Sequence, residues 1–80
     1  MWYNFQHALT IHYFPVKLSE DEWIKYYQGN IDGLLVRTTR GLTLSISAHH
    51  FQKFTCKIGL FGIFKLTLRN NQFVSLEKLP

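Results

Sequence analysis

Apolar and polar residues alternate with a period of two along most of this chain, and this pattern constrains its fold more than any other feature. Side chains of a β-strand point alternately to opposite faces, so each alternating segment predicts a strand with one buried face. In addition to these alternating segments, a last strand is predicted over residues 73–79. The chain is therefore expected to fold around a sheet. The predicted inward positions are Phe14, Val16, Leu18, Leu34, Val36, Thr38, Leu42, Leu44, Ile46, Phe64, Leu66 and Leu68.

Turn signals separate these strands. Arg40 and Gly41 predict a tight reversal. It would join the second predicted strand, residues 34–39, to the third, residues 42–47, in a hairpin. Residues 70–72, Asn-Asn-Gln, predict a second hairpin, and residues 30–33 predict a turn before the first one. Pro15 has no backbone N–H to donate, so the first strand is expected to lie at an edge or to carry a bulge.

One helix is predicted after the first strand. Ser19 has the properties of an N-cap, and Glu22 three residues later completes a capping box. Leu18 and Trp23 have the spacing of a hydrophobic staple across this start. Gly29 is expected to end the helix in the left-handed conformation.

Aromatic residues on this helix predict where it packs. Trp23, Tyr26 and Tyr27 follow helical spacing and are expected to face the sheet. A short helical or irregular segment, AHHFQKF, is expected to be anchored by Phe51 and Phe54.

The predicted order is strand, helix, hairpin, short helical turn, hairpin. It predicts an α+β domain with five strands in one mainly antiparallel or mixed sheet. Gly59 and Gly62 bracket the start of the fourth strand, and a kink there would curl the sheet into a small barrel.

Length and composition bound the class of protein. Eighty residues predict one hydrophobic core. The single cysteine, Cys56, cannot form an internal disulfide, which predicts a fold held by packing in a reducing compartment, the cytoplasm. The start does not resemble a signal peptide, and no apolar run approaches the ~20 residues that span a bilayer. We expect a single globular domain over residues 12–80, preceded by an N-terminal extension or added edge strand over residues 1–11.

Several short motifs follow one another along the chain: a helix ending Tyr-Tyr-x-Gly, a Val-Arg-Thr hairpin, Gly-x-x-Gly-x-Phe and Ser-Leu-Glu. They lie in the strings FPVKLSEDEWIKYYQG, LLVRTTRGLTLSISA, FQKF and GLFGIFKLTLRNNQFVSLEKL. Over residues 12–79 the chain resembles a family of small bacterial proteins, the domain of unknown function number twenty-eight thirty-five. This resemblance implies a bacterial cytoplasmic protein and the fold above, and it implies no activity or cofactor. The matching residues are Ser19, Tyr26, Tyr27, Gly29, Val36, Arg37, Thr38, Gly41, Phe54, Gly59, Gly62, Phe64, Ser75, Leu76 and Glu77.

Positive charge is concentrated in one part of the sequence. The net charge is +4, and no acidic residue occurs between Asp32 and Glu77. Arg37, Lys65 and Arg69 are predicted on the outward side of the two hairpins among hydroxyl residues, which suits contacts with phosphates. A solvated sheet face more commonly has the same composition. The candidate anion or nucleic-acid surface comprises Arg37, Arg40, Lys53, Lys57, Lys65 and Arg69.

An apolar contact surface is also predicted. Phe61 and Ile63 fall on the outward side of the fourth strand, and exposed apolar patches mark contact surfaces. Trp2, Tyr3 and Phe5 are further candidates for this patch. A homodimer joined by edge strands or by the patch is the predicted assembly.

Catalytic and metal-binding patterns are not recognisable. His49, His50 and Cys56 have no orienting residue for a Cys–His pair, and the histidines have no zinc-type spacing. The segment from Gly59 to Gly62 lacks the spacing and the lysine of a phosphate loop. We expect no enzyme activity, metal, cofactor, small-molecule substrate or membrane partner. The leading hypothesis is a protein-interaction or self-associating module, and the alternative is a nucleic-acid-binding accessory protein.

Overall fold

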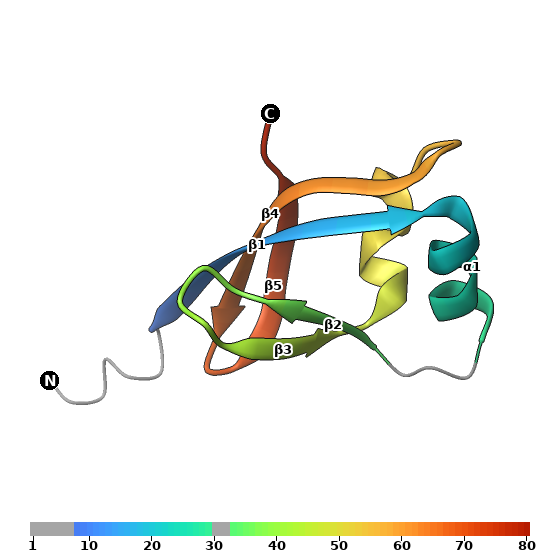
Figure 1. Ribbon diagram of the computed structural model, residues 1–80. Helices are drawn as coiled ribbons and strands as arrows, with labels where there is room; N and C mark the ends of the chain where they lie inside the picture. Colours follow the sequence, from blue (N-terminus) through green and yellow to red (C-terminus); the bar gives the residue numbers. More distant parts are fainter. Residues whose placement is uncertain (1–7, 30–32) are drawn as a thin grey trace, which may run out of the picture.

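A computed structural model describes residues 8–29 and 33–80 of the chain (Figure 1). The predictions made for Trp2, Tyr3, Phe5 and the turn at residues 30–32 lie outside this part. The order of elements is the predicted one, with a 3-10 helix as the short helical segment. The elements are β1 (Leu9–Ser19), α1 (Glu20–Gln28), β2 (Leu34–Arg37), β3 (Thr43–Ile46), η2 (Ala48–Phe54), β4 (Gly59–Arg69) and β5 (Gln72–Lys78).

The strands form two sheets, and the prediction of a single five-stranded sheet was wrong. One sheet has the order β1-β4-β5 and the other is the hairpin β2-β3, with every pair antiparallel. The hairpin meets β1 through the backbone N–H of Thr39, which donates to the carbonyl oxygen of Tyr13. β2 and β3 have four residues each, too few to pair along the eleven residues of β1. The strands therefore do not close into a barrel.

The first strand lies at a sheet edge, as Pro15 predicts, and begins at Leu9. Residues 9–11 therefore continue the edge strand of the sheet, and residues 1–7 lie outside the described part of the chain. Gly59 and Gly62 have φ of 131° and 150°, yet β4 stays in register with β1 through both. The two glycines thus do not turn a barrel corner.

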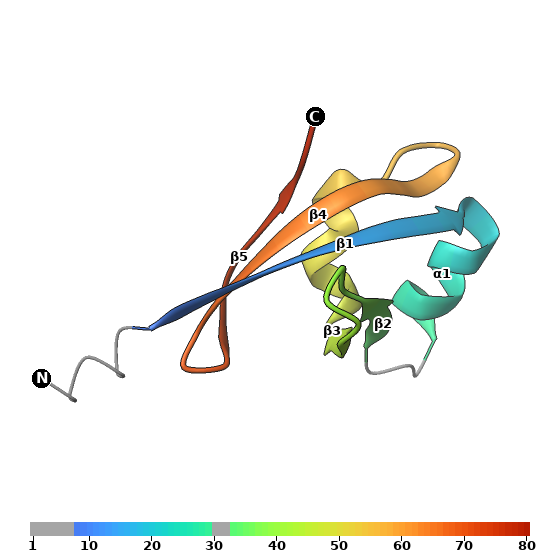
Figure 2. The ribbon, with the colours of Figure 1, turned by 60° about the vertical axis from the view of Figure 1, so that its left-hand side comes forward.

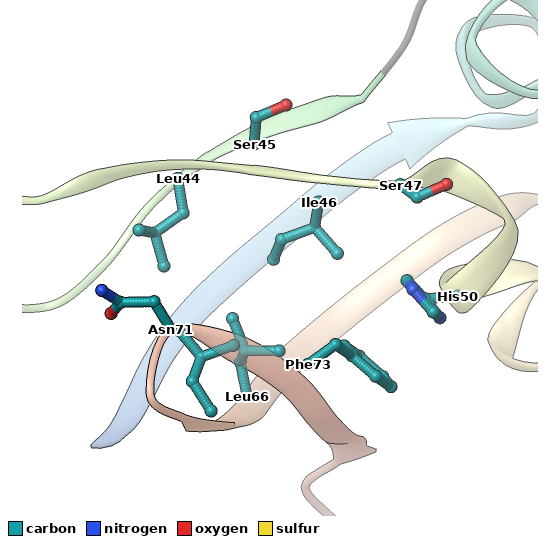
Figure 3. A pocket seen from close by; sticks show the side chains of 9 residues that line it. Leu44, Ser45, Ile46, Ser47, His50, Leu66, Asn71 and Phe73 are labelled. Atoms are coloured by element: carbon teal, nitrogen blue, oxygen red, sulfur yellow. The ribbon is translucent and has the colours of Figure 1, made fainter. Parts of the chain in front are cut away.

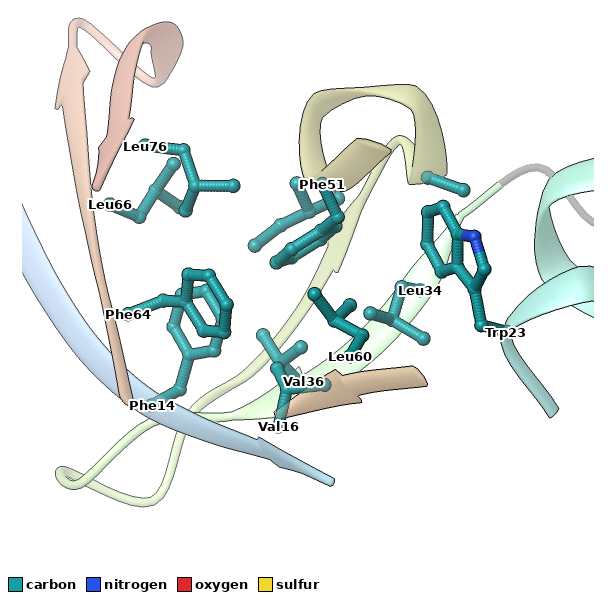
Figure 4. Packing of buried hydrophobic residues seen from close by; sticks show 12 residues of the cluster. Phe14, Val16, Trp23, Leu34, Val36, Phe51, Leu60, Phe64, Leu66 and Leu76 are labelled. Atoms are coloured by element: carbon teal, nitrogen blue, oxygen red, sulfur yellow. The ribbon is translucent and has the colours of Figure 1, made fainter. Parts of the chain in front are cut away.

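The core lies between the three-stranded sheet and the elements that cover one of its faces (Figure 4). Phe64 is fully buried at its centre and stacks on Phe14, with 5.9 Å between ring centroids. Phe51 and Phe54 of η2 meet the same ring edge-on at 5.4 and 5.3 Å. The predicted anchoring of the short helix is thereby confirmed. The buried apolar residues are Phe14, Val16, Trp23, Leu34, Val36, Ile46, Ala48, Phe51, Leu60, Phe64, Leu66 and Leu76.

The hairpin of β4 and β5 turns at Asn70 and Asn71, within the predicted segment. Both residues have positive φ, 51° and 65°, which matches the tight turns that favour asparagine. The register shifts between Thr67 and Leu68, as in a β-bulge. This end of the sheet extends away from α1 and η2, so the molecule is elongated (Figure 2).

Local hydrogen bonds fix the start of α1. The backbone N–H of Glu22 donates to Ser19 Oγ at 3.3 Å, and the backbone N–H of Ser19 donates to Glu22 Oε1 at 3.0 Å. The predicted capping box is confirmed. The Ser19 hydroxyl also donates to Glu22 Oε1 at 3.0 Å. The bond from the Ser19 backbone, followed by the bond from its hydroxyl, lowers the pKa of the Glu22 carboxyl. The left-handed ending was wrong, because Gly29 is extended with φ of −81°.

Removing the N-cap hydroxyl should weaken the fold measurably. We expect Ser19→Ala to lower the free energy of unfolding by about 1 kcal/mol, because an orphan backbone donor of α1 loses its acceptor. Urea unfolding followed by circular dichroism measures this loss. Ser19→Asp keeps an acceptor at the N-cap and should stay close to wild type; equal losses in both variants would contradict the capping explanation.

Two predicted inward positions are exposed. Trp23 is buried and Tyr26 partly buried, but Tyr27 is 41 % exposed and only stacks on Trp23. The helix has nine residues and covers the core with about one turn, so its last aromatic residue reaches solvent. Leu42 is 49 % exposed because it lies in the tight reversal, before β3 begins.

Candidate interaction surface

One face of the three-stranded sheet lies opposite the core. Inward residues of β1 pair with inward residues of β4, for example Phe14 with Phe64, so the residues between them point outward. Pro15 pairs with Ile63 on this outer face, and Tyr13 pairs with Lys65. We call the apolar residues of this outer face the apolar patch: Leu9, Ile11, Tyr13, Pro15, Phe61 and Ile63.

The apolar patch is accessible over most of its length. Leu9, Ile11, Tyr13 and Ile63 all count as exposed large hydrophobic residues, and Ile63 is 52 % exposed. Phe61 lies on the outer face opposite Lys17 and is partly buried. The elements that pack on this sheet contribute their buried residues to the other face, which leaves the patch uncovered in the described part of the chain.

Sequence reasoning found Phe61 and Ile63 but missed the contribution of β1. The residues of β1 had a readable signal, because Tyr13 and Pro15 alternate with buried Phe14 and Val16. Their pairing with β4 had none, since the two strands are far apart in the chain. The register of β1 with β4 is what joins the two halves of the patch.

The six predicted cations do not converge on one surface. Lys65 and Arg69 share the outer face through alternate positions of β4. Arg37 ends β2 and Arg40 lies in the hairpin turn, on the other sheet. Lys53 belongs to η2 and lies over the ring of Phe54 at 5.2 Å.

Lys57 lies at the opposite end of β4 from Arg69. It precedes β4, whereas Arg69 ends that strand. Eleven residues of extended strand separate such ends by roughly 30 Å. The described structure therefore divides the positive charge among several surfaces.

The outer face nevertheless carries a net positive charge. Lys17 lies opposite Phe61, Lys65 opposite Tyr13 and Arg69 opposite Leu9. Glu77 pairs with Lys65 from β5 and is the one carboxylate that the described strands place on this face. Three cations against one anion make the surroundings of the apolar patch positive.

A groove lies on the inner side, between β3 and the hairpin of β4 and β5. Its volume is about 380 Å³. Leu44 and Ile46 point into it from β3, while Leu66 and Phe73 face them from the hairpin (Figure 3). The ring of His50 stacks on Phe73 with centroids 3.8 Å apart. No sequence signal could have revealed this stack, because it joins separate elements.

His49 and Cys56 have separate hydrogen-bond partners in the described part of the chain. His49 Nδ1 is 2.7 Å from Ser47 Oγ, and the Cys56 thiol donates to the carbonyl oxygen of Gly59 at 3.6 Å. Burial, followed by the charges of His49 and Lys53, lowers the pKa of His50. Among the described residues there is no group of three or more metal-ligating side chains, and none of the helices is long and apolar enough to cross a membrane.

The family model described as protein of unknown function (DUF2835) matches residues 10–79. The chain belongs to DUF2835. No curated protein and no solved structure is significantly similar to it.

In this DUF2835 domain, several of the residues that carried the resemblance have roles in the fold. Ser19 caps α1, and Gly41 occupies the hairpin turn with φ of 86°. Gly59 begins β4 against β1, and Phe64 is the centre of the core. The motifs thus account for the architecture, and the apolar patch and the groove lie beside them.

Proposed function

We propose that this DUF2835 domain is a non-enzymatic module that binds another protein through the outer face of its three-stranded sheet. The supporting observation is the apolar patch, which runs across β1 and β4 and is uncovered in the described structure. Uncovered apolar patches on small domains are characteristic of contact surfaces. A flat sheet face of this kind suits a helix or a second sheet laid across it.

The charges around the patch favour one kind of partner. Lys17, Lys65 and Arg69 border it, and Glu77 offsets only one of them. Two copies placed face to face would bring these cations together, which opposes self-association. A partner with an apolar stripe bordered by Asp and Glu would match both the patch and its rim.

Ile63 is the residue whose replacement should affect binding most, because it combines high exposure with a central place in the patch. A photoreactive amino acid at position 63 would capture the partner in cells for identification by mass spectrometry. We expect Ile63→Ser to weaken the purified complex on the order of tenfold, through lost apolar contact. Isothermal titration calorimetry measures this change, and the fold should be unaffected because Ile63 is outside the core.

Leu35 provides the matched control, since it is 68 % exposed on the other sheet. The same photoreactive group there should not capture the partner, and Leu35→Ser should bind as wild type. Equal capture at both positions, or unchanged binding by Ile63→Ser, would contradict the proposal. Sedimentation at several concentrations tests self-association: a dimer abolished by Ile63→Ser would identify a second copy as the partner.

Nucleic-acid binding is the second candidate function, and one observation favours it. Tyr13 lies opposite Lys65, and Phe61 lies opposite Lys17, which mixes aromatic rings with cations on an open sheet face. The division of the six predicted cations among several surfaces counts against it. Binding of a single-stranded oligonucleotide that weakens with salt, and is lost in Lys65→Glu but kept in Arg37→Glu, would support this candidate.

A further inference from the structure

The groove between β3 and the β4–β5 hairpin has the properties of a ligand site for an apolar chain. Its volume of about 380 Å³ lies within the range of about 300–1,000 Å³ found for small-molecule sites. Aliphatic side chains supply its walls, with Leu44 and Ile46 on one side and Leu66 and Leu68 on the other. A hydrocarbon chain would bury apolar surface against these side chains.

Two stacked rings lie at one end of this groove. His50 and Phe73 are nearly parallel, with 8° between their planes. The ring of His49 lies 4.5 Å from that of His50 and is tilted by 39° to it. Beyond the stack lies a second hollow of about 490 Å³, which also borders on Gln52 and Lys53. His50 and Phe73 line both hollows, so the two are continuous along one surface.

The two hollows differ in polarity and have only one sign of charge. Lys53 and the two histidines border the second hollow, and no described carboxylate lines either one. Glu77, the acidic residue of β5, pairs with Lys65 on the outer face and points away from the groove. An anionic group would therefore meet complementary charge at one end and apolar side chains at the other.

We propose that this groove binds an amphiphile, whose apolar chain lies between Leu44 and Leu66 and whose anionic head lies beside Lys53 and His50. The site is separate from the apolar patch, because the two lie on opposite faces of the three-stranded sheet. A free fatty carboxylate and an anionic phospholipid share this chemistry. A flat surface for proteins and a groove for amphiphiles would thus coexist in one small domain.

Octanoate is a suitable probe because it combines an aliphatic chain with a single carboxylate. In an NMR titration of the isotope-labelled protein, we expect saturable shifts at Leu44, Ile46, Leu66 and Phe73. The bound carboxylate should raise the pKa of His50, because a nearby anion favours the charged imidazolium. Octylamine has the same chain with a cationic head, and it should bind on the order of tenfold more weakly.

Two variants separate the head from the chain. Lys53→Gln removes a charge from an exposed position and should weaken octanoate several-fold while leaving neutral octyl glucoside unchanged. Leu44→Gln should weaken both ligands. Ile63→Ser is the matched control on the outer face and should bind octanoate as wild type does. The groove proposal and the protein-binding proposal can therefore fail independently of each other.

The source of the ligand is tested with vesicles of anionic phospholipid. Co-sedimentation that depends on Lys53 would identify a lipid headgroup, whereas octanoate binding without co-sedimentation would identify a free carboxylate, and either result supports the site. Absence of both would overturn the proposal. Equal affinity for octanoate and octylamine, or shifts confined to the outer face, would overturn it as well.

Discussion

Replacing Phe64 with alanine should lower the free energy of unfolding by about 3–5 kcal/mol, the range found for large aromatic residues in cores. Phe64 is fully buried and contacts three other rings, those of Phe14, Phe51 and Phe54. Truncation would remove these contacts and leave a cavity between the sheet and η2. Because small domains have little stability to spare, this variant is expected to be largely unfolded at room temperature.

The measurement is urea unfolding followed by circular dichroism and tryptophan fluorescence. Phe64→Leu fills most of the volume, so it should remain folded with a smaller loss and keep the prediction measurable. Phe73→Ala is the matched control, because Phe73 lies on the neighbouring strand and is 42 % exposed. A loss in Phe73→Ala as large as that in Phe64→Ala would show that Phe64 is not the centre of the core.

Gly59→Ala is expected to lower the free energy of unfolding by about 3 kcal/mol or more, since backbone strain of about 1–3 kcal/mol is combined with a steric overlap. Gly59 has φ of 131°, a conformation that residues with a side chain rarely adopt. A Cβ at this position would overlap the carbonyl oxygen of Leu18 and lie 2.7 Å from the carbonyl carbon of Ser19. These atoms are backbone and cannot move aside without separating β4 from β1.

Gly41 offers a control with positive φ and open space. Its φ is 86°, and the nearest side-chain atom to an added Cβ is Arg37 Nη2 at 3.9 Å. Gly41→Ala should therefore lower the free energy of unfolding only by the cost of the positive φ, about 1–2 kcal/mol. Thermal unfolding of both variants tests the difference. Similar losses would indicate that the close approach of β4 to β1 does not matter.

Features determined by neighbouring residues could be predicted from the sequence. The capping box of α1 needs only Ser19 and Glu22, and the turn at Asn70 and Asn71 needs only a two-residue loop between two strands. Alternation separated inward from outward residues in β4 for the same reason. The helix and most of the core were therefore readable before any tertiary structure was known.

Features determined by distant residues could not be predicted. Tyr27 and Leu42 have the right periodicity for burial, but nothing in their own segments says where the covering elements end. The separation into two sheets depends on how β2 and β3 cross β1, which alternation does not encode. The same limit applies to the candidate sites, because pairing of β1 with β4 assembles the apolar patch and packing of β3 and η2 against the β4–β5 hairpin assembles the groove.

The pairing of β1 with β4 also has a consequence for how the protein forms. Leu9 pairs with Arg69 and Ser19 with Gly59, so β1 has its main partner about 40 to 60 residues later in the sequence. Until that partner leaves the ribosome, Phe14 and Val16 have no sheet in which to be buried. Closing so long a loop costs entropy that no early contact repays. We therefore expect β1 to remain unpaired until β4 has been synthesised.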